Sequence, residues 1–318
     1  MRVSLAKSPL DVDALERGLA EVIGSKVPVR VIERARNSYA STFPSEIVTC
    51  AVGTATLQLL CKYELPWAHD VYGRPAGVVY EAEVYRRAVA PARLPAPRFY
   101  GLATDPGTDT SWLVVEHLPG TLRVAKAPDP QAITWAAQWI GAFHRFHEGG
   151  PSPAGRINRH DRRYFTERVE RALEHSKPLE AQHPWFPRLA ASFEAELVDL
   201  LLERPTVIHG DFYPENVLTR ESRVYPIDWA SAAWSAGEID LAALTEGHWT
   251  DEAVQAATSG YAHARWASAP GVDFAARVES AAMWLHFRAF ASAPSAPFIP
   301  GAAWRFEQLH RAAERLGV

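Results

Sequence analysis

The chain has 318 residues, which is more than one ordinary compact core holds, so we expect two lobes or one core with elaborations. Its hydrophobic fraction of 47% and charged fraction of 22% are typical of a soluble globular protein, and no apolar run is long enough to span a bilayer. A formal net charge of -4 gives no electrostatic reason to expect a nucleic-acid partner. Residues 1–10 lack the apolar stretch and the cleavage site of a secretory signal. These features predict a cytoplasmic protein without a membrane or nucleic-acid partner, either monomeric or homodimeric.

The N-terminal part of the chain begins with a helical pattern and continues with strands. Ser8, Pro9 and Asp11 have the spacing of an N-cap, a first helical residue and a capping-box acid. The expected elements that follow are strands over 29–33, 47–52 and 56–62, a turn at 53–54, a helix over 79–90 ending at Pro91, and a strand over 112–117. The three first strands predict a small antiparallel sheet. Cys50 and Cys61 fall on adjacent strands of it, where we interpret them as small buried hydrophobic residues.

The remainder of the chain is mainly helical. Asp129 is a candidate N-cap and Pro130 a first helical residue for a helix that Gly149 and Gly150 end. Two short strands, 206–209 and 224–228, flank a polar segment, and further helices run from about residue 238 to the C-terminus. The chain therefore predicts a mixed α/β fold.

The polar segment between the two short strands is the most informative part of the sequence. It reads Val207-Ile208-His209-Gly210-Asp211-Phe212-Tyr213-Pro214-Glu215-Asn216-Val217-Leu218, so an apolar strand delivers an acid and, five residues later, an amide. Asp228 ends the following strand and would lie beside that amide. Phosphoryl transfer needs a positioned acceptor hydroxyl, magnesium held against the phosphates and neutralised charge. Asp211 is the candidate for the base that receives the proton of the hydroxyl. Asn216 and Asp228 are the candidates for the hard oxygen ligands of Mg²⁺, and His209 completes the catalytic run.

The nucleotide side is expected upstream. Lys62 ends an apolar strand, from which its ammonium can reach nucleotide phosphates, and Glu81 on the following helix is its expected ion-pair partner, with Glu83 as the alternative. The loop over 35–43 contains no glycine, and its backbone N–H groups with the Ser38 or Ser41 hydroxyl are the candidates for binding phosphate oxygens.

The strand that precedes the lobe boundary carries Val115, Glu116 and His117, which are the candidates for an adenine-binding hinge. In a kinase this connecting segment binds adenine through its backbone, so the side chains themselves are not diagnostic.

Together these residues resemble the aminoglycoside phosphotransferase and choline kinase superfamily of small-molecule kinases. The resemblance rests on the runs 209–218, 227–229, 237–242, 140–144 and 115–120, and on Lys62 with Glu81. It implies a bilobal protein-kinase-like fold, with a nucleotide-binding lobe of small antiparallel sheet over 1–117 and a helical catalytic and substrate-binding lobe over 118–318. It also implies ATP or GTP as donor, Mg²⁺ on Asn216 and Asp228, Asp211 as base, Lys62 on the phosphates, and Asp240 as a structural brace of the catalytic loop.

The acceptor is not identified by the sequence. Only eleven residues separate Asp228 from Asp240, too few for the activation segment of a regulated protein kinase, so a protein substrate is not expected. An aminoglycoside, a sugar, a nucleoside or an amino alcohol all fit, and antibiotic resistance, biosynthesis and primary metabolism are compatible roles. Two alternatives stay open. One is a kinase-like nucleotide-binding protein without turnover, and the other is a metal-dependent hydrolase that uses His209, Asp211, Asp228 and His248 as ligands.

Overall fold

The computed structural model describes residues 10–39, 43–64, 77–149, 157–266 and 270–318. The chain divides into two compact units. The first consists of residues 1–122 and 218–231, and the second of residues 123–217 and 232–318.

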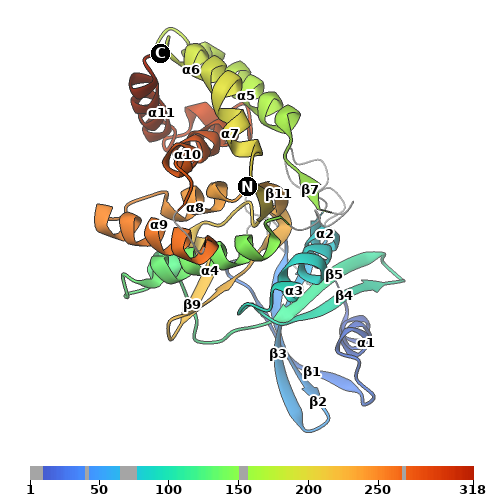
Figure 1. Ribbon diagram of the computed structural model, residues 1–318. Helices are drawn as coiled ribbons and strands as arrows, with labels where there is room; N and C mark the ends of the chain where they lie inside the picture. The colour runs from blue at the N-terminus through green and yellow to red at the C-terminus, as the bar shows by residue number, and fades with distance from the viewer. Residues whose placement is uncertain (1–9, 40–42, 65–76, 150–156, 267–269) are drawn as a thin grey trace. The chain divides into compact units, whose positions relative to one another are not determined.

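The first unit is built on a five-stranded antiparallel sheet of order β1-β2-β3-β5-β4 (Figure 1). Its strands are β1 Val29–Arg36, β2 Ser45–Val52, β3 Ala55–Tyr63, β4 Phe99–Asp105 and β5 Thr110–Glu116. The three first strands agree with the sequence pattern, and β4 is a strand that the pattern did not indicate. Gly53 makes the turn from β2 to β3 with a φ of 61°, a conformation that costs glycine little. In the register of the sheet Lys62 lies opposite Ser45 on β2 and Leu113 on β5.

One amphipathic helix, α1 Val12–Ile23, packs beside β4 and its neighbours (Figure 1). Leu15 and Leu19 are fully buried and join the core that contains Trp112. The N-cap of α1 is Asp11, whose carboxylate accepts a hydrogen bond from Ala14 N at 2.7 Å. The sequence interpretation of Asp11 as a capping-box acid inside the helix was therefore wrong, while Ser8 and Pro9 lie outside the described residues.

The second helix of this unit is longer and less regular than the sequence predicted. It runs as α2 Gly77–Val84, a π-helical turn η2 Tyr85–Val89 and a last turn α3 Ala90–Ala92. The predicted span of 79–90 was two residues short at each end, and Pro91 stands within the last turn, just after the wider π turn.

The second unit is mainly helical. Its helices are α4 Ala132–His147, α5 Arg162–Ser176, α6 Phe186–Ser192, α7 Val198–Leu202, α8 Glu238–Thr245, α9 Asp251–Arg265, α10 Phe274–Phe290 and α11 Ala303–Leu316. A small sheet of order β7-β11-β8 joins β7 Asn158–Arg159, β11 Ala233–Ala236 and β8 Pro205–Ile208. The first unit has a further sheet of order β10-β9-β6, made of β10 Arg223–Pro226, β9 Val217–Arg220 and, at the boundary of the unit, β6 Leu122–Arg123.

Helices α4 and α9 pack closely along each other (Figure 1). A Cβ atom on Gly141 would lie 2.6 Å from Tyr261 O, so this close approach requires glycine. The N-cap of α4 is Gln131, and the Asp129 carboxylate accepts from Gln131 N at 2.8 Å. The prediction of Asp129 as the N-cap was therefore wrong, since its side chain closes the turn that leads into the helix.

A large aromatic and aliphatic core lies between α5, α6, α10 and α11. Phe165, Phe186, Trp284, Phe287 and Phe306 are buried in it. These aromatic side chains therefore pack in the core of the second unit.

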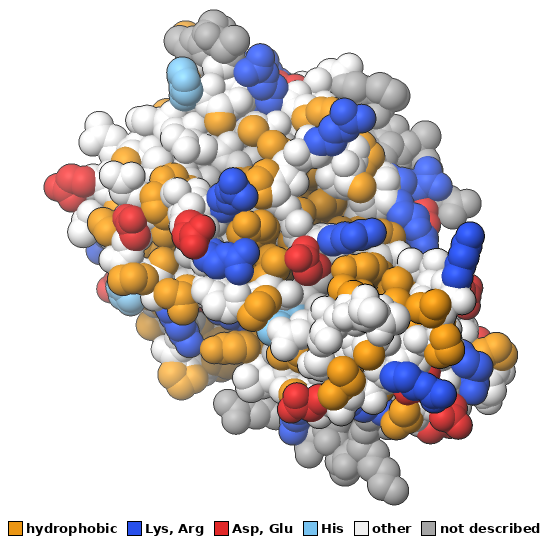
Figure 2. All heavy atoms as spheres, turned by 90° about the horizontal axis from the view of Figure 1, so that it is seen from below, with side chains coloured by type: hydrophobic (Ala, Val, Ile, Leu, Met, Phe, Trp, Pro, Cys, Tyr) orange, Lys and Arg blue, Asp and Glu red, His pale blue; other side chains and the backbone are white. Residues whose placement is uncertain are grey.

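Acidic and basic side chains are mixed on one face of the molecule (Figure 2). On the face drawn in Figure 2, Lys and Arg side chains lie among Asp and Glu side chains, with hydrophobic side chains between them. None of the helices that the structure describes combines the length and apolar composition needed to cross a membrane.

Candidate active site

Lys62 lies at the end of β3 in the first unit, with its ammonium between two carboxylates. Lys62 Nζ is 2.6 Å from Glu81 Oε2 and 2.6 Å from Asp228 Oδ1. Glu83, the alternative partner, instead pairs with Arg86 and Arg87 on the exposed side of the helix. Of the two carboxylates considered from the sequence, Glu81 is thus the one on the same face as Lys62.

Burial and charge act in opposite directions on this group. Burial alone lowers the pKa of Lys62, but the Asp228 and Glu81 carboxylates outweigh it and raise the pKa above its ordinary value. Burial raises the pKa of Glu81, and the Lys62 ammonium opposes that shift. Lys62 is therefore a fixed positive charge at neutral pH.

Asp228, the second residue after β10, is held in a left-handed backbone conformation with a φ of 68°. Such a conformation is uncommon for a residue other than glycine, although aspartate and asparagine tolerate it better than most. The next peptide is fixed by Trp229 N, which donates to Glu81 Oε1 at 3.2 Å. The Asp228 side chain remains 40% exposed, so it combines a fixed position with access for a ligand.

The other residues predicted for the nucleotide side are less engaged. Ser38 is exposed in the turn after β1, and Ser41 lies outside the described residues. In the hinge segment, Val115 pairs with Leu60 of β3. Glu116 N donates to Arg98 O at 2.8 Å and His117 N donates to Gln58 O at 3.1 Å. These two N–H groups are already bonded within the sheet.

The second unit carries the catalytic run, which leaves β8 at Ile208. Gly210 has a φ of 79°, and this turn brings Asp211 out of the buried strand with 40% of its side chain exposed. Asn216 donates through Nδ2 to Asp211 O at 2.9 Å and to Asp211 Oδ2 at 3.0 Å. His209 is fully buried, and its Nδ1 accepts from Asp211 N at 3.3 Å. His209 therefore shapes the loop rather than facing outward.

Asp240 on α8 anchors the backbone of this loop. Its carboxylate accepts from His209 N at 2.6 Å, from Gly210 N at 2.9 Å and from His144 Nε2 at 3.1 Å. Asp240 and His144 are both fully buried. Burial is the main reason that the pKa of His144 lies below its ordinary value, so the ring is neutral at pH 7. Because a carboxylate only accepts, the His144 proton lies on Nε2.

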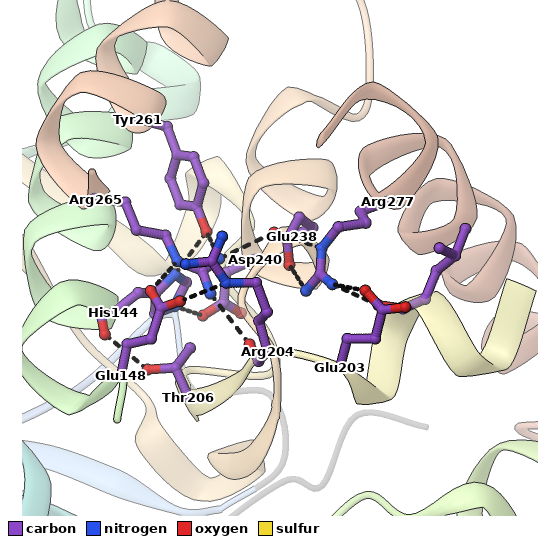
Figure 3. A network of polar contacts seen from close by, with 11 residues as sticks. His144, Glu148, Glu203, Arg204, Thr206, Glu238, Asp240, Tyr261, Arg265 and Arg277 are labelled. Atoms are coloured by element: carbon purple, nitrogen blue, oxygen red, sulfur yellow. Dashed lines mark hydrogen bonds and ion pairs between the residues drawn. The ribbon is translucent and has the colours of Figure 1, made fainter. Parts of the chain in front are cut away.

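The anchor continues into a buried polar network around Tyr261 and Arg265 of α9 (Figure 3). The Tyr261 hydroxyl lies 3.0 Å from His144 Nδ1 and accepts from Arg265 Nη1 at 2.6 Å. Gly237, just before α8, makes room for these groups, since a Cβ there would lie 2.6 Å from both Arg265 Nη1 and His144 Nδ1. A continuous chain of donors and acceptors thus runs from α9 to the catalytic loop.

Glu238 is the charged centre of the same network (Figure 3). Its fully buried carboxylate accepts from Arg265 Nη1 at 3.1 Å and from Arg277 Nε at 3.1 Å. Burial alone would raise the pKa of Glu238, but the two guanidinium groups lower it below the ordinary value. Sequence reasoning included Glu238 only as part of a motif, and it missed Arg265 and Arg277 as partners.

Arg288 on α10 is a further residue that sequence reasoning did not place at the site. Its guanidinium donates to Gly210 O and to the Tyr213 hydroxyl, the latter at 3.3 Å. Its Nη2 atom lies 3.6 Å from Asp211 Oδ1. Burial alone lowers the pKa of Arg288, but Tyr213 and Asp211 outweigh it, so the group stays charged. No local signal identified it, because its contacts join residues more than seventy positions apart in the chain.

Asn216 in the second unit and Asp228 in the first unit each offer an oxygen donor of the kind that a magnesium ion prefers. Asp228 offers a partly exposed carboxylate, and Asn216 uses its Nδ2 atom for Asp211, which directs the amide oxygen away from that bond. Within the described part of the chain, no three His, Cys, Asp or Glu side chains gather to hold a metal ion, and His248 is exposed. The hydrolase alternative, which needs such a cluster, gains no support.

The sequence matches a family model described as the phosphotransferase enzyme family over residues 72–274. No curated protein sequence matches the chain.

Several solved structures are similar to this one over nearly the whole chain. The GDP complex of aminoglycoside 2'-phosphotransferase-IIIa is 13% identical, with a TM-score of 0.64 over 96% of this chain and 99% of that chain. Choline kinase LicA from Streptococcus pneumoniae is 12% identical, with a TM-score of 0.62 over 95% of this chain and 98% of that chain. A thermostable mutant of aminoglycoside phosphotransferase APH(4)-Ia, in a ternary complex with ADP and hygromycin B, is 14% identical, with a TM-score of 0.60 over 95% and 98%. The mixed α/β, protein-kinase-like fold expected from the sequence is therefore confirmed.

Proposed function

Because this chain belongs to the phosphotransferase enzyme family, it is a phosphotransferase, and we propose that it transfers the terminal phosphoryl group of ATP to a hydroxyl group of a small molecule. The family predicted from the sequence motifs is thereby confirmed, whereas the donor, the metal ion and the acceptor belong to this proposal.

The observation that carries the proposal is the way in which Asp211 is held. Its backbone is fixed through Gly210 and Asp240, its carboxylate is oriented by Asn216, and its side chain is partly exposed. A carboxylate in this position can accept the proton of an acceptor hydroxyl as that hydroxyl attacks phosphorus. We assign Asp211 as the catalytic base, and His209 as the buried residue that shapes its loop.

Lys62 is assigned to the phosphates of the nucleotide. It is a permanently charged ammonium held by Glu81 and Asp228, so no free energy is spent in orienting it during the reaction. Asn216 and Asp228 would hold Mg²⁺, which supplies charge neutralisation on the phosphoryl oxygens. Ser38, Val115, Glu116 and His117 remain assigned to nucleotide binding from the sequence pattern, with GTP as an alternative donor.

The family indicates that the acceptor is a molecule with a hydroxyl group, and it does not specify which one. The names of the similar structures refer to an aminoglycoside phosphotransferase and a choline kinase. For this chain, a hydroxyl on an aminoglycoside, a sugar, a nucleoside or an amino alcohol is proposed, acting in the cytoplasm. A role in antibiotic resistance is one form of this proposal. The alternative is a nucleotide-binding protein that has no turnover.

The test is magnesium-dependent ADP release from ATP across a panel of these acceptors. Asp211→Asn should lower kcat by about 10²- to 10⁴-fold while Mg-nucleotide binding persists, because the base does not bind the nucleotide. Asp228→Asn should weaken Mg-nucleotide binding as well, and asparagine keeps the left-handed backbone accessible. Asp251→Asn, at an exposed position of α9, is the matched control.

Each outcome has a distinct meaning. Acceptor-dependent release that is lost in Asp211→Asn and kept in Asp251→Asn supports the kinase and its base. Turnover that is equal in Asp211→Asn and the unmodified protein refutes the assigned base. Nucleotide binding without ADP release from any acceptor favours the alternative of a binding protein.

A further inference from the structure

A compact group of aromatic and basic side chains lies at the start of α5, outside the residues assigned so far. The His160 ring stacks on the Tyr164 ring with centroids 3.6 Å apart and planes within 7°. The Arg168 guanidinium lies 3.4 Å from the centroid of the same Tyr164 ring. Two planar groups cannot occupy one face of a ring at these separations, so Tyr164 is sandwiched between His160 and Arg168.

Helix α10 brings Arg288 to this group. Trp284, one helical turn before Arg288, packs against Tyr164 with ring centroids 5.7 Å apart, and α5 and α10 lie against each other (Figure 1). Arg288 and Trp284 are four residues apart and therefore lie on the same side of α10. Arg288 is close enough to Arg168 and His160 to contribute, after burial, to lowering the pKa of each. We call His160, Tyr164, Arg168 and Arg288 the basic cluster.

The basic cluster lies beside the proposed base. Arg288 Nη2 is 3.6 Å from Asp211 Oδ1, and the same guanidinium is bonded to the carbonyl of Gly210. Arg288 thus ties α10 directly to the catalytic loop, and both segments of the cluster belong to the same compact unit.

In the described part of the chain, the two guanidinium groups of the cluster have one carboxylate within ion-pair distance, that of Asp211 beside Arg288, while the Glu167 carboxylate acts on Arg168 from farther away. Among the residues that the structure describes, Arg168 has no carboxylate within ion-pair distance, and its hydrogen bond goes to Tyr164 O of its own helix at 3.2 Å. His160 Nδ1 is buried and has no hydrogen-bond partner within the described ranges. Placing two guanidinium groups close together in a partly buried position is unfavourable unless an anion compensates them. Arg168 and Arg288 are both partly exposed, so a ligand can reach them.

We propose that the acceptor molecule carries an acidic oxygen group, a carboxylate or a phosphate, and that Arg168 and Arg288 bind this group while Asp211 receives the proton of the hydroxyl. This inference rests on the proposed kinase function and names the substrate class for it. Guanidinium groups suit such a ligand because their planar N–H donors match the oxygens of carboxylate and phosphate. The Tyr164 ring holds Arg168 in place. A polycationic acceptor would meet repulsion at the same place.

The experiment compares matched acceptors that differ in one acidic group. Glucose is paired with glucose 6-phosphate and with glucuronate, ribose with ribose 5-phosphate, and ethanolamine with serine, and kcat/KM is measured by ADP release. For an accepted anion, Arg168→Met should lower the ratio of kcat/KM for the anionic member to that for the neutral member by about 10- to 100-fold, as expected when a charged hydrogen bond is lost. Arg168→Lys should restore part of the ratio, because it returns the charge without the planar donor pair.

The matched control is Arg163→Met on the same helix, where the side chain is 84% exposed and pairs with Glu167. It should leave the ratio unchanged. Thermal unfolding of the three variants shows whether the Tyr164 stack is disturbed. If a disturbed stack caused the fall in the kcat/KM ratio, Arg168→Lys and Arg168→Met would be destabilised to the same extent.

Failure of this inference differs from failure of the kinase proposal. If neutral or cationic acceptors turn over and Arg168→Met changes no ratio, the anionic class is wrong while the kinase stands. If no acceptor turns over, calorimetric titration with inorganic phosphate decides. Binding that weakens tenfold or more in Arg168→Met, and not in Arg163→Met, supports the anion site. Absence of binding, or equal binding in both variants, overturns it.

Discussion

Replacing Asp240 by asparagine tests whether the buried anchor places the catalytic loop. The substitution keeps the size of the side chain but leaves one accepting oxygen where the carboxylate has two. In the unmodified protein His209 N and His144 Nε2 both donate to Asp240 Oδ2. The asparagine keeps both of these bonds when its amide oxygen takes the place of Oδ2. The amide NH₂ group then faces Gly210 N, which at present donates to Oδ1 at 2.9 Å. One hydrogen bond to a charged group is lost and two donors meet.

The magnitude follows from these contacts. Loss of a hydrogen bond to a charged partner costs about 1.5 to 3 kcal/mol, and an unsatisfied buried donor costs about 1 to 3 kcal/mol. Removing the buried charge offsets part of this cost. We expect a net loss of about 2 to 4 kcal/mol in the free energy of unfolding, a large fraction of the stability of a typical domain. A shift of Gly210 by about 1 Å would also move Asp211 and lower kcat by on the order of 10²-fold.

Urea unfolding followed by tryptophan fluorescence measures the stability, and ADP release with the best acceptor measures kcat. Asp199→Asn is the control, because that carboxylate is 63% exposed in a surface pair with Arg162 and its loss should change the unfolding free energy by less than about 0.5 kcal/mol. If Asp240→Asn is as stable as Asp199→Asn, the anchoring role is refuted. If it loses stability but keeps kcat within about twofold, Asp240 stabilises the fold without positioning Asp211.

Two further predictions concern buried charge. Glu81→Gln should lower the free energy of unfolding by about 1 to 3 kcal/mol and weaken nucleotide binding, because Lys62 then keeps only Asp228 as a negatively charged partner. Glu83→Gln should change both quantities by little. Equal effects of the two variants in urea unfolding and nucleotide titration would contradict the role given to Glu81. Burial, with the Arg305 guanidinium, lowers the pKa of His286 to about 3, so the unfolded chain takes up a proton that the folded chain refuses as the pH falls below about 6.5. The contribution of neutral His286 to the free energy of unfolding is complete above about pH 6.5, is smaller by about 2 kcal/mol at pH 5 and continues to fall toward pH 3. A His286→Gln variant whose unfolding shows the same pH dependence as that of the unmodified protein would disprove this assignment.

The sequence determined those features that local periodicity and short spacing encode. The alternation of apolar residues located β1, β2 and β3, and Gly53 located the turn between the last two. The spacing of Asp211 and Asn216 placed both side chains in one loop, where the structure joins them by a hydrogen bond. Helix ends were placed less well, because Asp11 and Asp129 can each close a turn or cap a helix, and the sequence pattern of polar residues is the same in both cases.

Only the tertiary structure decided the partners of the buried charged groups. Glu81 and Glu83 stand two residues apart on one helix and point in different directions, and the sheet that packs against the helix determines that Glu81 meets Lys62. The bond from His144 to Asp240 spans 96 positions, and Arg288 reaches Gly210 across 78. A hydrophobic pattern specifies which face of a helix is buried, but it does not specify which polar groups meet there. Those meetings depend on how separate helices pack, and they decide both how the catalytic loop is held and where the basic cluster lies.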